Sequence, residues 1–434
     1  MTTHATRICW LTALAVVFAS TTSVSAQVPA KLIVKQGDVF GLRTVSTVNA
    51  PFTDGNGKVG FVVGFNDATR GIWHNNGFVF NSSDALPDSL TGSESTMGVS
   101  DTGGFVYSPS FNGNDAVYTH AGKLLAGTDA ISSLPGRFST FNSRPTMLPN
   151  GTAFWMGGSA ATQGGSTTNR HLFKAADVSD PMSIVPVLSG GDVVGGFPIS
   201  TAASNFTYHI SDNGAHHIHI IDQTTGSSAN NLALYYNGDI VARESGPIIS
   251  GGTWVDFDGV SVNNVGEWVV AGNTSGPASQ DEVIAFKGEV KVREGDTIGG
   301  VTLASGATVR GVSINNLSEV VHIWGWGSGG TAQEHLFFGN GSTLSDSIRL
   351  LSRGDVIDVD NDTIGDYIVD DFNASFVIGP GLSLAEDGFV YLDVDLIPVA
   401  GGASQAAVIR LRVPEPGTLG LLALGSLLVF RRRR

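Results

Sequence analysis

A four-residue turn followed at once by an apolar strand recurs along the whole chain, and this repeat constrains the fold most strongly. Its clearest copy is Asn263–Gly266, just before Trp268. Asn and Asp tolerate left-handed backbone, and Gly accepts a positive φ without a clash, so we interpret the copies as hairpin turns. Variants of the turn end at positions 57, 103, 151, 214, 266, 318 and 388, which gives steps of 46, 48, 63, 52, 52 and 70 residues.

A second marker alternates with these turns. It is a short strand that ends in Gly-Asp, and its clear copies end at Asp38, Asp192, Asp296 and Asp355. Each unit therefore supplies about four strands in roughly 50 residues, which is the size of one β-propeller blade.

The phase of the repeat predicts a closed ring. The chain opens with a lone strand of the second kind, Lys31–Lys35, and ends with the strands Phe389–Leu396 and Ala406–Arg412, which no such strand follows. The first strand can complete the last blade, and this pairing removes an exposed sheet edge. We expect an all-β, seven-bladed β-propeller closed by its N- and C-terminal strands. A β-solenoid, which would need caps, is the main alternative, and two stacked sandwiches are a further one.

The first 26 residues have the pattern of a secretory signal peptide. Arg7 gives a basic start, Ile8–Ala19 is apolar, and small residues precede a cleavage site between Ala26 and Gln27. The apolar run is shorter than the roughly 20 residues of a permanent span. Cys9, the only cysteine, lies inside this segment, so we expect a mature protein without disulfides or thiol chemistry.

The C-terminal segment has three parts, namely Pro414-Glu415-Pro416, the apolar run Leu419–Phe430 and the basic end Arg431–Arg434. Arginines at the extreme end stay cytoplasmic, so the apolar run is held in the membrane while the residues before it lie outside. With only about 12 residues, the run suits a temporary anchor better than a permanent one.

This tail resembles the PEP-CTERM sorting signal of Gram-negative bacteria, with Pro414, Glu415 and Pro416 in the place of its recognition motif. The resemblance implies handling by the export machinery and an exosortase, transient membrane anchoring, and delivery to the cell surface or an extracellular matrix. A chance tail anchor is the alternative. We therefore expect a signal peptide at 1–26, a propeller domain at 27–413 and a sorting tail at 414–434.

The body of the chain is similar to exported tandem-repeat surface proteins whose units carry Asn-x-x-Gly-x-x-Ala-Phe. The likeness spans most of the mature chain but is diluted, because only Asn263–Gly266 keeps both Asn and Gly and no copy keeps the full octet. It implies no particular activity.

The charge balance limits the kinds of partner. Lys and Arg number 24 and Asp and Glu 39, so the formal net charge is −15. Loss of both terminal segments removes five arginines and one glutamate and leaves 19 minus 38, or −19. Such an acidic body repels DNA and anionic lipid, and we expect no nucleic-acid partner.

The sharpest cluster of candidate ligands lies in the longest repeat step. Asp358, Asp360 and Asp362 stand at alternate positions and Asp366 follows, which imitates the start of a calcium-binding loop. Thr363 stands where such a loop prefers Gly. The sequence is compatible with a calcium ion that orders the loop, and equally with a solvated acidic loop.

Histidines form a second group. On one strand His217 and His219 would share a face, while His216 would point the other way and His209 lies on a different strand. At most this pair plus a distant residue could therefore hold a transition metal. Strand histidines that are only partly exposed are the simpler interpretation.

Two tryptophans, Trp324 and Trp326, are separated by one glycine and would share a strand face. Such a surface could stack on sugar rings, because the apolar face of a pyranose matches an aromatic plane. Packing between blades is the alternative.

No catalytic motif was found in the sequence: it has no Gly-x-Ser-x-Gly elbow, no His-Glu-x-x-His and no phosphate-binding Gly-Lys loop. We expect a non-enzymatic surface or matrix protein that binds extracellular polysaccharide or partner proteins through loops at one end of the ring. The alternative is a secreted glycan-active enzyme with carboxylates in the central channel.

Overall fold

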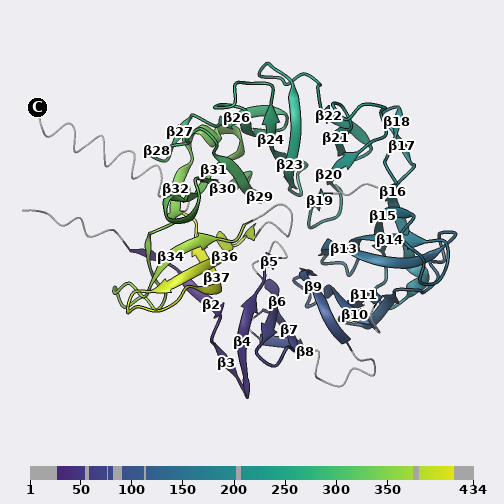
Figure 1. Cartoon of the computed structure of the whole chain (residues 1–434), viewed down its shortest axis with the longest axis horizontal. Coiled ribbons are helices and arrows are strands. Elements are labelled where there is room, and N and C mark those ends of the chain that lie inside the picture. The colour runs from purple at the N-terminus through teal and green to yellow at the C-terminus, as the bar shows by residue number, and fades with distance from the viewer. Residues whose placement is uncertain are drawn as a thin grey trace, which may run out of the picture.

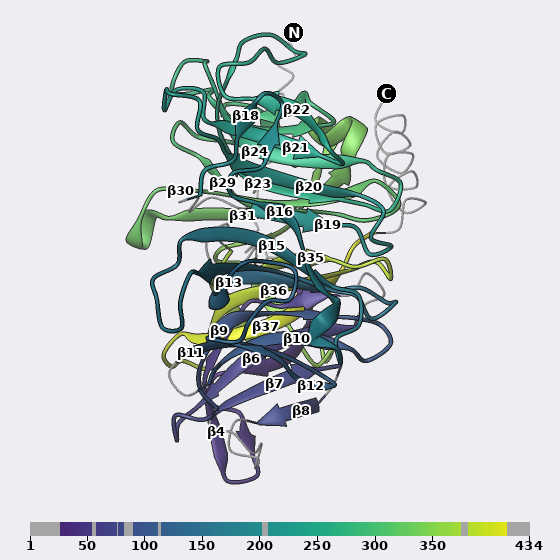
Figure 2. The ribbon, with the colours of Figure 1, turned by 90° about the vertical axis from the view of Figure 1, so that its right-hand side faces the viewer.

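The computed structural model describes residues 27–53, 58–75, 77–81, 90–111, 114–201, 207–374 and 381–414. Over these residues the regular structure consists of β-strands and three short 3₁₀ helices, Pro181–Ser183, Gly329–Thr331 and Gly341–Asp346. The strands form separate sheets that surround a common centre (Figure 1), and Figure 2 shows the same arrangement from the side.

Five of the sheets have four strands each, and in every one the strands lie in chain order with antiparallel neighbours. Their strands are β9 (Leu90–Val99), β10 (Phe105–Phe111), β11 (Asn114–Thr119) and β12 (Gly122–Ala126); β13 (Arg137–Met147), β14 (Ala153–Ala160), β15 (Asn169–Ala175) and β16 (Ile184–Ser189); β19 (Thr207–Ile210), β20 (His217–Asp222), β21 (Leu232–Tyr236) and β22 (Asp239–Arg243); β23 (Trp254–Val262), β24 (Trp268–Thr274), β25 (Glu282–Phe286) and β26 (Glu289–Arg293); β29 (Thr308–Ile314), β30 (Glu319–Trp326), β31 (Gln333–Asn340) and β32 (Ile348–Ser352).

Two larger sheets contain the first and last parts of the described chain. The six-stranded one consists of β3 (Val39–Phe40), β4 (Arg43–Val48), β5 (Phe52–Thr53), β6 (Val59–Phe65), β7 (Arg70–His74) and β8 (Gly77–Asn81). The seven-stranded one consists of β1 (Val28–Pro29), β2 (Lys31–Lys35), β33 (Val356–Asp358), β34 (Tyr367–Phe372), β35 (Leu382–Leu384), β36 (Phe389–Pro398) and β37 (Gln405–Arg412). Two small hairpins, β17 (Val193–Val194) with β18 (Phe197–Pro198) and β27 (Thr297–Ile298) with β28 (Val301–Thr302), lie in the connections between sheets.

The ends of the ring are joined by main-chain pairing. Strand β2 runs antiparallel to β37, with Lys31 opposite Arg410 and Lys35 opposite Ala407. The all-β propeller and its closure by terminal strands are therefore confirmed, and the chain does not form the alternative solenoid. Strand β1 adds a contact that the repeat did not indicate, because it pairs in parallel with β33.

Buried side chains fill the space between neighbouring sheets. One cluster joins the last sheet to the first, with Val34 and Val408 against Phe61 and Trp73. The clusters at the other sheet contacts include the fully buried side chains Trp155, Trp254, Trp324 and Tyr107. Because each sheet is buried on both faces, β6 and β14 consist entirely of buried residues instead of alternating with polar ones.

Carboxylates add a polar contact at three of the sheet boundaries. Asp115 accepts a hydrogen bond from the main-chain N–H of Phe141 at 2.9 Å. Glu282 accepts one from Val309 at 2.9 Å, and Glu334 one from Phe372 at 2.9 Å. In each case the carboxylate lies near the start of the third strand of one four-stranded sheet and binds an inner strand of the next sheet.

Burial raises the pKa of two of these acids. It raises the pKa of Glu282 to about 8 and that of Glu334 to about 7. Burial likewise raises the pKa of Asp393 to about 7. Buried histidines shift the other way, since burial lowers the pKa of His171 to about 4 and that of His322 to about 3.

Deletion of Lys31–Asp38 removes the closing strand, and we expect it to lower the melting temperature by about 10 °C or more, because the last sheet loses a strand and the ring opens. The control replaces a loop of equal length, 161–168 between β14 and β15, with Asn-Gly. Circular dichroism melts of both variants test the idea. Equal, small shifts in the two proteins would show that the terminal pairing is dispensable.

Stability should also peak near pH 6.5. An acid whose pKa is raised on folding stabilises the folded state at pH values below its unfolded pKa. This contribution is lost as the pH rises through the folded pKa. The free energy of unfolding should therefore fall between pH 6.5 and 8, by about 2 kcal/mol for Glu282 alone. Below pH 6.5 the buried histidines lower the free energy of unfolding as the pH falls, because their side chains bind protons in the unfolded chain before they do so in the folded protein. Urea unfolding at pH 5, 6.5 and 8 measures this. The Glu282→Gln variant should show a weaker loss above pH 6.5, and an unchanged slope would contradict the assignment.

Candidate functional site

A cavity lies at the centre of the ring and is called the channel below; its empty volume, open solvent included, is about 880 Å³. Figure 1 shows the innermost strands of the four-stranded sheets around this centre, namely β9, β13, β19, β23 and β29. Its wall is mainly apolar and hydroxyl-bearing, and Asp212 is the one acidic residue among its described lining. Each of the five four-stranded sheets and each of the two larger sheets contributes one of seven apolar lining residues, namely Phe52, Val99, Met147, Ile210, Val260, Val312 and Leu382.

The repeated turns gather at one mouth of this channel. They follow the innermost strands, so closure of the ring brings turns from different sheets together. The pocket that they form, called the mouth pocket below, is lined by Pro149, Asn150, Asp212, Asn213, Asn264, Asn316 and Glu386. Every one of these residues belongs to a turn that the sequence analysis identified.

Neighbouring turns are joined by hydrogen bonds from main chain to side chain. The N–H of Asn213 donates to Oδ1 of Asn264 at 2.8 Å, and the N–H of Asn264 donates to Oδ1 of Asn316 at 2.7 Å. The N–H of Asn316 in turn donates to Oε1 of Glu386 at 2.7 Å. We call these three bonds the turn ladder, and they connect four successive sheets.

Sequence reasoning missed this ladder. It recognised Asn as a turn former but not as a link between turns. The signal was nevertheless present, because Asn264, Asn316 and Glu386 occupy the same second position of their turns. Only a polar side chain with an acceptor oxygen can accept the main-chain N–H of the preceding turn from that second position.

The ladder fixes the orientation of two amides. Because Oδ1 of Asn264 and Oδ1 of Asn316 each accept a main-chain N–H, the Nδ2 group of each side chain must point elsewhere. Within the described part of the chain neither Nδ2 group has a hydrogen-bond partner. Both asparagines are lining residues of the mouth pocket.

The mouth pocket also contains carboxylates from separate sheets. Asp212 and Glu386 line both it and the adjoining part of the channel. Burial raises the pKa of Glu386, and the nearby acids Glu319 and Asp387 raise it further, while the hydrogen bond from Asn316 lowers it.

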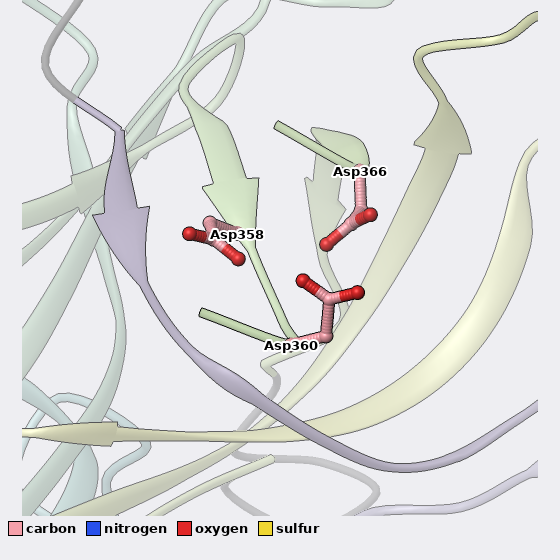
Figure 3. A group of neighbouring side chains, drawn as sticks. All are labelled: Asp358, Asp360 and Asp366. Atoms are coloured by element: carbon pink, nitrogen blue, oxygen red, sulfur yellow. The ribbon is translucent and has the colours of Figure 1, made fainter. Parts of the chain in front are cut away.

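The acidic loop brings three of its four predicted ligands together. One carboxylate oxygen from each of Asp358, Asp360 and Asp366 lies within 4.8 Å of the others (Figure 3). Asp362 is not a member of this group, and its Oδ1 accepts the N–H of Ile364 at 2.7 Å. No other group of three acidic, histidine or cysteine ligands gathers in this way over the described ranges.

Main-chain N–H groups already bind these carboxylates. Asp358 accepts hydrogen bonds from Asn361 at 2.7 Å and Thr363 at 2.9 Å. Asp366 accepts one from Val359 at 2.8 Å. These contacts explain how an acidic loop holds its shape, and they leave both sequence interpretations, a calcium ion and a solvated loop, in place.

The histidines lie as their strand positions indicated. His217 and His219 share a face, with Nδ1 of the first 2.9 Å from Nε2 of the second. His216 is 2.9 Å from the hydroxyl of Tyr236 instead, and Nδ1 of His209 accepts the N–H of Val262. The pair therefore gains no third ligand from this group.

Trp324 and Trp326 do not form an exposed aromatic surface in this structure. Trp324 is fully buried between two sheets, and its Nε1 donates to Nδ1 of His322 at 3.1 Å. Trp326 is partly buried and packs against the ring of His335 at 5.0 Å. Alternation along a strand correctly placed both indoles on one face, but in a propeller that face is covered by the next sheet.

The remaining predicted sites lie at the limits of the described residues. Gln27 is the first and Pro414 the last of these, while Ala26, Glu415 and Pro416 lie outside them. Among the described residues no helix is long and apolar enough to span a membrane, and the apolar run 419–430 is not among them.

Residues 412–434 match the PEP-CTERM protein-sorting motif. The sorting tail predicted from Pro414, Glu415 and Pro416 is thereby confirmed. Its presence directs the protein across the inner membrane to the cell surface or the extracellular space, through recognition by exosortase-type sorting machinery. The expected likeness of the body to Asn-x-x-Gly tandem-repeat proteins is not confirmed and stays a prediction.

No curated protein matches the chain. Among solved structures, the WD40 β-propeller domain of Doa1 has a TM-score of 0.39 at 8% identity, over 89% of this chain and 98% of that one. PorZ, a surface component of the type-IX secretion system of Porphyromonas gingivalis, has a TM-score of 0.42 at 13% identity, over 88% of this chain and 46% of that one. A protein of unknown function from Dyadobacter fermentans has a TM-score of 0.36 at 11% identity, over 89% and 99% of the two chains. Similarity at this level carries no functional argument.

Proposed function

We propose that this protein is a non-enzymatic binding module of the cell surface or extracellular matrix, and that it binds extracellular polymer or partner proteins at the channel mouth. The observation that carries the proposal is the sorting motif at residues 412–434, which follows directly on a ring whose turns form a polar pocket. A signal peptide at residues 1–26, cleaved between Ala26 and Gln27, would start the export that the tail completes.

The proposal includes a ring of seven blades over residues 27–413. Five four-stranded sheets and two larger ones support this number, as do the seven turns of the repeat. Turns from several blades around one mouth would let a ligand contact those blades at once, in the way that loops on a rigid scaffold provide binding sites.

A second candidate is a glycan-active enzyme. It is favoured by one observation, namely that Asp212 and Glu386 come from separate sheets and both line the mouth pocket. Burial raises the pKa of Glu386, as a general acid in glycoside hydrolysis would require.

The exported protein, purified after processing, should be retained by at least one polysaccharide or envelope fraction of its host without degrading it. Affinity co-sedimentation with such fractions measures binding, and a reducing-end assay on the same samples measures hydrolysis. Failure to bind any fraction would contradict the proposal. Release of reducing ends that is lost in Asp212→Asn and Glu386→Gln would instead assign the enzyme.

Calcium should order the acidic loop if the loop is a cation site. Titration of calcium into the exported protein should then raise the melting temperature, because an ion that binds only the folded state stabilises it. The double variant Asp360→Ala and Asp362→Ala should lose the effect. A variant with Asp177→Ala and Asp180→Ala, two exposed acids in another turn, serves as the control. If the melting temperature depends on calcium in the same way in all three proteins, the loop is not a cation site and is a solvated acidic loop.

A further inference from the structure

We propose that the mouth pocket binds an uncharged, hydroxyl-rich sugar residue of a glycan chain. The inference rests on the proposed function and specifies its ligand. It follows from the pattern of hydrogen-bond donors and acceptors that the turn ladder imposes on the pocket.

The donors are the Nδ2 groups of Asn264 and Asn316. Their orientation follows from the ladder, since each Oδ1 accepts the N–H of the preceding turn at 2.8 and 2.7 Å. A free asparagine could turn either end of its amide toward a ligand. Here only the NH₂ end is left, and both side chains are half-buried residues of the pocket lining.

The acceptors are carboxylates. Glu386 uses Oε1 for the N–H of Asn316, and its other oxygen has no hydrogen-bond partner in the described part of the chain. A second acidic residue, Asp212, lines the same pocket. The pocket therefore combines amide donors and carboxylate acceptors within one small volume.

This combination selects the class of ligand. Two carboxylates and a net charge of −15 oppose an anion such as a phosphate or a uronate. A hard cation needs several oxygen ligands, but the amide oxygens of Asn264 and Asn316 are occupied by the ladder. Hydroxyl groups both donate and accept, so neighbouring hydroxyls of a neutral sugar satisfy both kinds of group.

Apolar side chains stand beside the donors. Val265 and Leu317 immediately follow Asn264 and Asn316 in their turns, and their exposed fractions are 64% and 63%. Both lie in the same place of the repeat, in turns joined by the ladder. These two residues are not part of the pocket lining, but they expose apolar surface in the same turns as the two donors, and the C–H face of a sugar ring can pack on such a surface.

The test exchanges only the donors. In the double variant Asn264→Asp and Asn316→Asp, an aspartate oxygen can still accept the ladder N–H, while the NH₂ donor becomes a carboxylate oxygen. The control, Asn66→Asp and Asn340→Asp, makes the same change of charge at two exposed asparagines whose Oδ1 atoms also accept a main-chain N–H. Neither of these lines the pocket.

The probes are neutral hexasaccharides of glucose, galactose and mannose, and an acidic hexasaccharide of guluronate. Saturation-transfer NMR and calorimetry with the exported protein should show binding of at least one neutral probe. The donor variant should lose about tenfold or more in affinity, the equivalent of one to two hydrogen bonds, with a melting temperature close to that of the control.

Each other outcome overturns the inference in a recognisable way. If the donor variant binds a neutral probe as well as the control does, the site is elsewhere but the proposed function stands. Binding of guluronate alone contradicts the neutral class of ligand. If the protein binds neither these probes nor any host polysaccharide or envelope fraction, the proposed function fails and this inference fails with it.

Discussion

The antiparallel pairing of β2 with β37 is the interaction on which the rest of the structure depends. A row of sheets that pack face to face has two uncovered ends, and each would expose a sheet face and a strand edge. By placing its first strand in its last sheet, the chain covers both ends at once, and Val34 then packs in the cluster that joins the last sheet to the first. No disulfide within the chain contributes, since the sequence has only one cysteine.

The mouth pocket is a consequence of this closure. Turns at positions 213, 264, 316 and 386 are separated by 51, 52 and 70 residues in sequence, and only the ring brings them within hydrogen-bond distance. The same asparagines that form turns locally therefore also bind their neighbours and fix the chemistry of the pocket. Local propensity, sheet packing and the proposed recognition thus rest on the same side chains.

Much of the fold could be predicted from the sequence, because repeat spacing and turn chemistry are local properties of the chain. The site was harder, because it depends on which surfaces meet. Alternation placed Trp324 and Trp326 on one face but could not reveal that the next sheet covers it. The spacing of the aspartates identified Asp358, Asp360 and Asp366, yet Asp362 forms its own turn instead. The turn ladder of Asn264 and Asn316 could not be predicted, because its hydrogen bonds join turns that only the closed ring brings together.

The geometry also connects the pocket to the sorting tail. The N–H of Val413 donates to the carbonyl of Gly388 at 2.9 Å, and Gly388 ends the turn that contains Glu386. The chain thus leaves the ring beside the mouth pocket, where the sorting motif begins. The proposed binding pocket and the first residues of the sorting motif, 412–414, therefore lie next to each other in the fold.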